Sequence, residues 1–123
     1  MSQSSRVKYD FGSLNLNNFS IDKSSVTQVT SNTTAVSITT QAGIITTQTM
    51  TTPSNEARQF TVNHPDVTVD SVILANIMNY AGTTGLPNLY IDNPTTGSFL
   101  ATVQNHHTSG SLNGVVKIAY FIL

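Results

Sequence analysis

The sequence contains no cysteine and no tryptophan, and only 9% of its 123 residues are charged. The lack of cysteine excludes a disulfide framework and a thiolate metal site, and it suits a reducing compartment. The longest apolar run, residues 118–123, is far shorter than a membrane span, and residues 1–25 lack the apolar core of roughly 7–15 residues found in secretory signals. We therefore expect a soluble protein made in the cytoplasm, with no membrane partner.

The few charges are also nearly balanced. Five Lys and Arg residues and six Asp and Glu residues give a formal net charge of −1, and no basic stripe is present to neutralise phosphates. Nucleic acid is therefore not an expected partner. The surface must be mostly hydroxyl and amide, and such a low net charge does little to oppose association between copies. This composition is typical of a protein that works packed against other polypeptides.

Apolar residues alternate with Ser, Thr and Asn in many short segments, among them 26–30, 35–39 and 60–63. Successive side chains of a β-strand point to opposite faces, so this alternation predicts strands with one buried face. The branched Cβ of threonine fits the pleated backbone, which makes it a suitable polar partner on the other face.

Short strands at regular spacing, separated by turn residues such as Ser31-Asn32, Asn93-Pro94 and Ser109-Gly110-Ser111, are typical of a sandwich or a barrel. We predict an all-β protein: an antiparallel β-sandwich, jelly-roll-like, of about eight strands with an extended N-terminal arm. The predicted strands cover residues 26–31, 34–40, 43–51, 56–63, 67–80, 87–92, 98–105 and 113–122.

Residues 1–24 form the predicted N-terminal arm, and residues 25–123 form the β-sandwich domain. The arm holds nearly half of the charges, and its apolar residues alternate with polar ones. It is either a first hairpin of the same domain, with Gly12-Ser13 as the turn, or an arm that adds a strand to a neighbouring subunit. In the second case the partner-binding residues would be Tyr9, Phe11, Leu14, Leu16 and Phe19.

Two segments, 72–75 and 115–123, are apolar on both faces. This pattern predicts strands that are central to a sheet or covered on the outside by another subunit. Lys117 is the exception within the second segment. It is either a lysine that extends its amine into solvent or part of a buried ion pair at an interface.

No arrangement of ionisable residues predicts catalysis. Asp66 and Asp70 are four residues apart, about 13 Å along a strand, whereas glycoside hydrolysis uses roughly 5–9.5 Å. The three histidines, His64, His106 and His107, have no metal-ligand spacing, although one histidine from each copy could meet on a trimer axis. No nucleophile elbow or phosphate loop occurs. We expect no enzymatic activity, no catalytic residue, no metal and no cofactor.

The second half of the chain carries a recognisable series of strands and turns. It comprises Gly97-Ser98-Phe99, an alternating strand to Asn105, Ser109-Gly110-Ser111-Leu112 and the final apolar strand. Together with upstream segments, this series resembles a family of small β-sandwich virion structural proteins of tailed bacteriophages, over residues 25–123. The upstream segments are Val26-Thr27-Gln28, Ile44-Ile45-Thr46 with Met50, Phe60-Thr61-Val62-Asn63 and Asp70 before residues 72–76. The sequence departs from the family pattern at Pro53-Ser54-Asn55-Glu56 and Leu86-Pro87-Asn88.

The resemblance implies a capsid decoration (cement) protein or a similar domain of a head or tail fibre. Its partners would be the major capsid protein and copies of itself, as a trimer or dimer, and it would reside on the capsid surface of the virion. The alternative is a receptor-binding or glycan-binding domain of a fibre. In that case the loops 81–86 and 105–113 would carry recognition, with Tyr80 and Tyr90 as a small aromatic platform.

Overall fold

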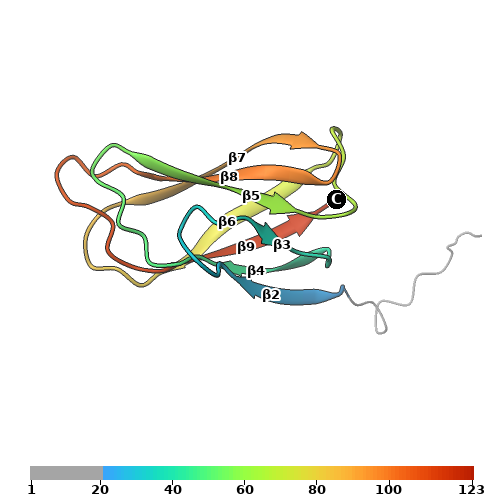
Figure 1. Cartoon of the computed structure of the whole chain (residues 1–123), viewed down its shortest axis with the longest axis horizontal. Helices are drawn as coiled ribbons and strands as arrows, with labels where there is room; N and C mark the ends of the chain where they lie inside the picture. Colours follow the sequence, from blue (N-terminus) through green and yellow to red (C-terminus); the bar gives the residue numbers. More distant parts are fainter. Residues whose placement is uncertain (1–20) are drawn as a thin grey trace, which may run out of the picture.

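The computed structural model describes residues 21–123, which form two four-stranded β-sheets packed face to face (Figure 1). The first sheet has the order β2-β4-β9-β6 and the second the order β3-β5-β8-β7. This confirms the predicted all-β sandwich. No helix in the described part of the chain could span a membrane. The strands are β2 (Lys23–Thr27), β3 (Val36–Ser37), β4 (Ala42–Thr46), β5 (Ala57–Asn63), β6 (Ile73–Tyr80), β7 (Pro87–Thr95), β8 (Ser98–Asn105) and β9 (Val116–Ile122).

The last two strands are central to the two sheets. β8 lies between β5 and β7, β9 lies between β4 and β6, and all four of these pairings are antiparallel. From β2 to β7 the chain changes sheet at every connection. Because each change reverses the chain direction, next-but-one strands run the same way. The pairs β2·β4 and β3·β5 are therefore parallel, which the prediction of antiparallel sheets did not include.

The core lies between the sheets and is filled by alternate residues of each strand. In β8 these are Phe99, Ala101 and Val103, and in β9 they are Val116, Ile118, Tyr120 and Ile122, all at most 5% exposed. The intervening residues point outward, as the period of two requires. The rest of the core comes from the earlier strands and loops: Val36, Ile38, Ile45, Met50, Phe60, Val62, Val67 and Leu112.

Several predicted boundaries differ in the structure: β3 and β4 are shorter than predicted, and three further differences have local causes. The strand predicted for residues 67–80 begins only at Ile73, because residues 64–72 make turns around His64 and Thr68. The turn predicted at Asn93-Pro94 lies inside β7. There Asn93 takes a left-handed φ of 52° next to a register shift, and the reversal falls at Gly97, whose φ is 90°. β2 begins at Lys23, so residues 23–24, assigned by prediction to the arm, belong to the sandwich.

Two fully buried threonines differ in how their hydroxyls are satisfied. The Thr47 side-chain oxygen accepts a hydrogen bond from the Val116 amide at 3.0 Å. The Thr52 side-chain oxygen has no hydrogen-bond partner among the described residues, although this residue is 0% exposed. A buried polar group without a partner costs free energy that an apolar group of the same shape does not.

This difference predicts opposite effects of one isosteric substitution. Thr52→Val should raise the free energy of unfolding by about 0.5–1.5 kcal/mol, because it removes an unpaired hydroxyl. Thr47→Val should lower it by about 1–3 kcal/mol, because it leaves the buried Val116 amide unpaired. Urea denaturation of both variants measures the two changes, and a Thr52→Val variant as destabilised as Thr47→Val would contradict the assignment.

Candidate binding surface

The outer faces of the two sheets differ in chemistry. The second sheet presents polar side chains around its centre, including Gln59, Thr61, Thr102 and Gln104. Gln59 donates to the Thr102 hydroxyl at 3.0 Å, so this face satisfies part of its own polarity. The first sheet instead presents a cluster of apolar side chains on β4, β6 and β9. A sheet face exposed to water is normally polar, so the first sheet is the unusual one.

The apolar side chains of the first sheet form a continuous surface across its strands. In one row Leu74, Phe121 and Ala42 are partners in register, and in the next row Asn76, Ala119 and Ile44 are partners. Beyond Leu74, Val72 and Leu123 exchange two backbone hydrogen bonds, at 3.1 and 2.8 Å. We call this surface the outer patch; its members are Val72, Leu74, Phe121, Leu123, Ala42, Ile44 and Ala119.

The outer patch is accessible in the described part of the chain. Leu74, Val72 and Leu123 are 54%, 52% and 59% exposed, and Phe121 is half-buried. Single exposed apolar residues are ordinary on protein surfaces, but contiguous ones mark interaction sites. Here neighbours in one sheet are exposed together, so the outer patch is the strongest candidate for a binding surface.

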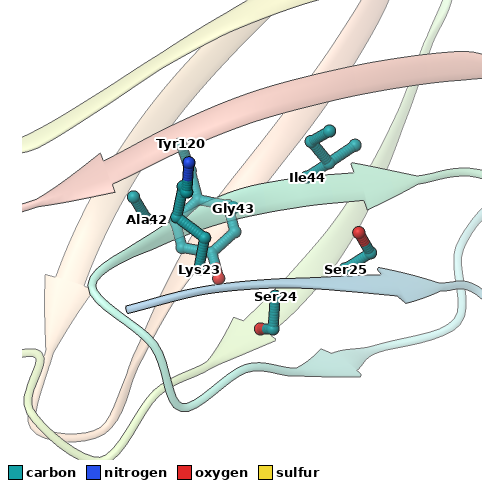
Figure 2. A pocket seen from close by; sticks show the side chains of 7 residues that line it. All are labelled: Lys23, Ser24, Ser25, Ala42, Gly43, Ile44 and Tyr120. Carbon is teal, nitrogen blue, oxygen red and sulfur yellow. The ribbon is translucent and has the colours of Figure 1, made fainter. Parts of the chain in front are cut away.

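Two shallow hollows of about 410 Å³ each flank the outer patch. One lies at β6 and β9 and includes Leu74 and Phe121. The other lies at β2 and β4, where Lys23, Ser25 and Ile44 surround Gly43 (Figure 2). A Cβ on Gly43 would collide with the Ser24 carbonyl oxygen and lie 2.7 Å from the Tyr120 hydroxyl oxygen, so there is no room for a side chain here. The hollows can receive apolar side chains of a partner.

Lys117 lies on the same outer face, two residues along β9 from Ala119, at the border of the outer patch. It is exposed on the central strand β9, in register with Thr46 and Asn79. This position agrees with the interpretation of a lysine that extends its amine into solvent. It adds a positive charge to the polar end of the face.

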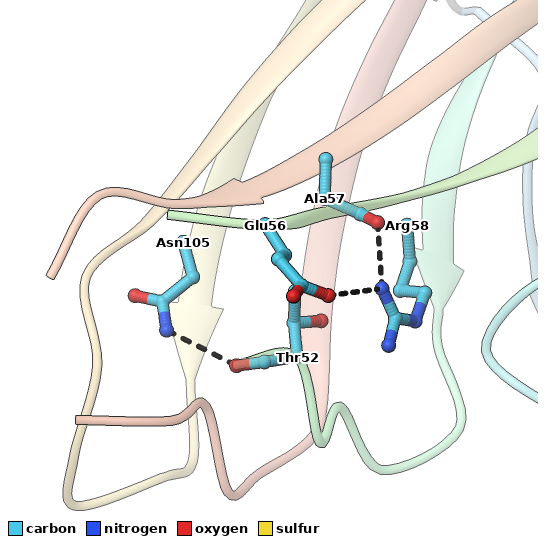
Figure 3. A network of polar contacts seen from close by, with 5 residues as sticks. All are labelled: Thr52, Glu56, Ala57, Arg58 and Asn105. Carbon is cyan, nitrogen blue, oxygen red and sulfur yellow. Dashed lines mark hydrogen bonds and ion pairs between the residues drawn. The ribbon is translucent and has the colours of Figure 1, made fainter. Parts of the chain in front are cut away.

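A second candidate surface is the loop end of the sandwich, at the left of Figure 1, where the loops 47–56, 81–86 and 106–115 meet. Fully buried Asn105 holds them together. Its side-chain nitrogen donates to the carbonyl oxygens of Thr52 (Figure 3) and Gly110, at 3.1 and 2.8 Å. Its side-chain oxygen accepts from the amides of Leu86 and His107, each at 3.0 Å. Nearby, a side-chain nitrogen of Arg58 lies 3.6 Å from a carboxylate oxygen of Glu56. Because both side chains are partly exposed to water, this ion pair contributes little stability.

The predicted tyrosine platform at this end is not formed by two equivalent rings. The Tyr80 hydroxyl accepts from the Asn113 amide at 2.8 Å, and its ring lies against Gly82, so this side chain supports the loop. Tyr90 is 47% exposed, and its hydroxyl is 2.9 Å from Nε2 of His106. The accessible aromatic surface is therefore the pair of Tyr90 and His106.

The other ionisable residues singled out in the sequence lie apart. His64 is buried at the opposite end of the sandwich, where its Nδ1 accepts from the Asp66 amide, so Nε2 donates to the Thr40 carbonyl at 2.9 Å. Asp66 and Asp70 are exposed in turns. Nδ1 of His107 accepts from the amides of Ser109 and Gly110. Within residues 21–123 no group of three or more His, Asp or Glu side chains is placed to hold a metal ion.

The predicted partner-binding residues of the arm, Tyr9, Phe11, Leu14, Leu16 and Phe19, lie outside the described residues. The sequence reasoning singled out part of the outer patch, because segments 72–75 and 115–123 are apolar on both faces. It missed Ala42, Ile44 and Asn105. The adjacent Ile44 and Ile45, which point to opposite faces, were the signal available for the outer patch.

A comparison of the chain with known protein families, curated proteins and solved structures found no match.

The role of Asn105 can be tested by removing its amide. Asn105→Ala should lower the free energy of unfolding by about 2–4 kcal/mol, because several loop amides and carbonyls lose a buried partner. Asn88→Ala, an exposed asparagine on β7, is the matched control and should change stability by less than about 0.5 kcal/mol. Urea denaturation measures both, and equal effects would show that Asn105 does not hold the loops.

Proposed function

We propose that this chain is a structural protein of a tailed-bacteriophage virion, most simply a capsid decoration protein that binds the assembled shell. In this proposal the outer patch contacts the major capsid protein, and the chain catalyses no reaction. Binding to the assembled shell, and not to free subunits, stabilises the shell by mass action.

The outer patch is the observation that carries the proposal. Burial of apolar surface drives most protein association, at about 25 cal/mol for each Å² removed from water. The other face of the sandwich is polar and can remain in solvent. A protein with one apolar and one polar broad face is suited to lie flat on a larger surface. The resemblance of residues 25–123 to virion structural proteins supports a capsid as that surface.

The N-terminal arm gives the proposal a second attachment. Tyr9, Phe11, Leu14, Leu16 and Phe19 would add apolar contacts to the capsid or to a neighbouring copy. The chain joins the sandwich at β2, whose first residue, Lys23, is in register with Ala42 of the outer patch. Two linked attachments raise the effective concentration of each other, so the arm and the outer patch would together bind more tightly than either alone.

The proposal can be tested with virions assembled from a genome that encodes this chain. Deletion of the gene should give heads that release DNA at a lower temperature, and addition of the purified full chain should restore the original temperature. Phe121→Lys should weaken binding to the gene-deleted heads by roughly 10–100-fold, because it places a charge in the apolar contact.

The matched control is Leu100→Lys, at an outward, half-buried position on β8, the central strand of the other sheet. This variant should bind the heads like the unchanged chain in a co-sedimentation series. Unchanged binding by Phe121→Lys would exclude the outer patch as the contact. Heads whose stability does not depend on the gene would refute the decoration role.

The exposed pair of Tyr90 and His106 favours a second candidate function, glycan recognition by a fibre domain. Aromatic faces beside polar loop groups suit sugar rings. A glycan array probed with the full chain should then show saturable binding that Tyr90→Ala abolishes. Absence of binding on the array would count against glycan recognition.

A further inference from the structure

Edge strands present unpaired backbone groups, and the four edges of this sandwich are protected to very different degrees. β2 is short and polar and begins with Lys23, and β3 has only two residues. β7 contains Asp92 and two prolines, and its register shifts near its end. These are the features by which natural proteins protect edges from other strands. β6, with eight residues, has no charge and no proline.

The hydrogen-bond pattern shows which backbone groups of β6 are free. Val72 and Leu123 exchange both of their backbone hydrogen bonds. In an antiparallel ladder such pairs recur at every second residue, so Leu74 and Asn76 also direct their amides and carbonyls toward β9. Ile73, Ala75 and Ile77 therefore direct theirs away from the sheet. Within residues 21–123, β6 pairs only with β9, and its register is regular up to the shift between Ile77 and Asn79.

We propose that a second copy of this chain occupies this edge, with the two β6 strands paired antiparallel across a two-fold axis. The two first sheets would then join into one sheet of eight strands. The inference does not depend on the proposed function, because it follows from the edge alone.

The absence of charge on β6 favours a second copy as the partner. In an antiparallel pair across a two-fold axis, residues near the axis lie close to their own copies, so a charge in the middle of the strand would oppose pairing. The outward side chains of β6 include Leu74, Asn76 and Met78. Every two-fold register therefore matches uncharged side chains only. Of the other edge strands, β7 carries Asp92 near its middle, and β2 has only five residues and begins with Lys23, so both are less suited to self-pairing.

The dimer would also change the binding surface. Leu74 belongs to both β6 and the outer patch, so pairing at β6 places the two outer patches side by side on one face of the joined sheet. A surface that contacts both patches would bind the dimer more tightly than a single copy, through effective concentration.

The absence of native cysteine allows a direct test by cross-linking the full chain. Leu74→Cys and Asn76→Cys variants, each alone and mixed with the other, should form disulfide-linked dimers under mild oxidation in at least one combination. A disulfide needs Cα atoms within about 7 Å, so the reactive combination identifies the register. Val29→Cys, an exposed apolar position outside β6, is the control and should stay largely monomeric. Cross-linking no faster than in the control for all three combinations would overturn the proposal.

Mass measurement of the uncross-linked chain gives a second, independent readout. Light scattering should report twice the chain mass of 13.2 kDa as concentration rises toward the millimolar range. Ala75→Pro removes an amide hydrogen that β9 does not use, and Asn76→Lys adds a charge to an outward position. Each should shift the chain to monomer while circular dichroism shows a retained β-sandwich. If Ala75→Pro fails to fold, Asn76→Lys alone decides. A monomer at all concentrations, or a dimer that persists in the folded variants, would overturn the proposal.

Discussion

The antiparallel ladders on both sides of β8 and β9 are the constraint on which the rest of the structure depends. Each of these strands has a partner on both sides, and their inward residues supply nearly half of the buried apolar core. β4, β5, β6 and β7 attach to them, and β2 and β3 attach further out. Because both central strands come from the last 26 residues, β4, β5 and β6 join their sheets through pairings that are distant in the sequence.

Much of this fold could be predicted from the sequence, because alternation of apolar and hydroxyl residues directly reports a strand with one buried face. The prediction succeeded for β5 and β8, where the pattern is regular and turn residues lie on both sides. It was less accurate at Asn93-Pro94, because asparagine tolerates the left-handed conformation and so lets β7 continue through a bulge. Parallel edge pairs were not predicted, since they follow from the order of crossings and not from any local pattern.

The binding surface could be predicted only in part, for a physical reason. Residues 72–75 and 115–123 have the same apolar character on both faces, yet β9 is central and β6 is an edge. The difference is set by pairing between residues far apart in the chain, which local periodicity does not contain. Likewise, nothing in the sequence around Asn105 distinguishes it from the many exposed asparagines. Its role appears only when loops from three parts of the chain come within hydrogen-bond distance of one side chain.

The distribution of polar groups links stability to binding in this protein. With 9% charged residues, the chain satisfies its loops with buried amides and hydroxyls, whose hydrogen bonds do not weaken with salt as surface ion pairs do. This leaves the charges few, and the outer patch itself holds none, although Lys23 and Lys117 border it. An apolar face beside an uncharged edge is a liability for an isolated monomer, because both promote association. The same two features are useful in a protein that spends its life on an assembled surface. In the proposed assembly, the shell would cover the face and the proposed second copy would cover the edge.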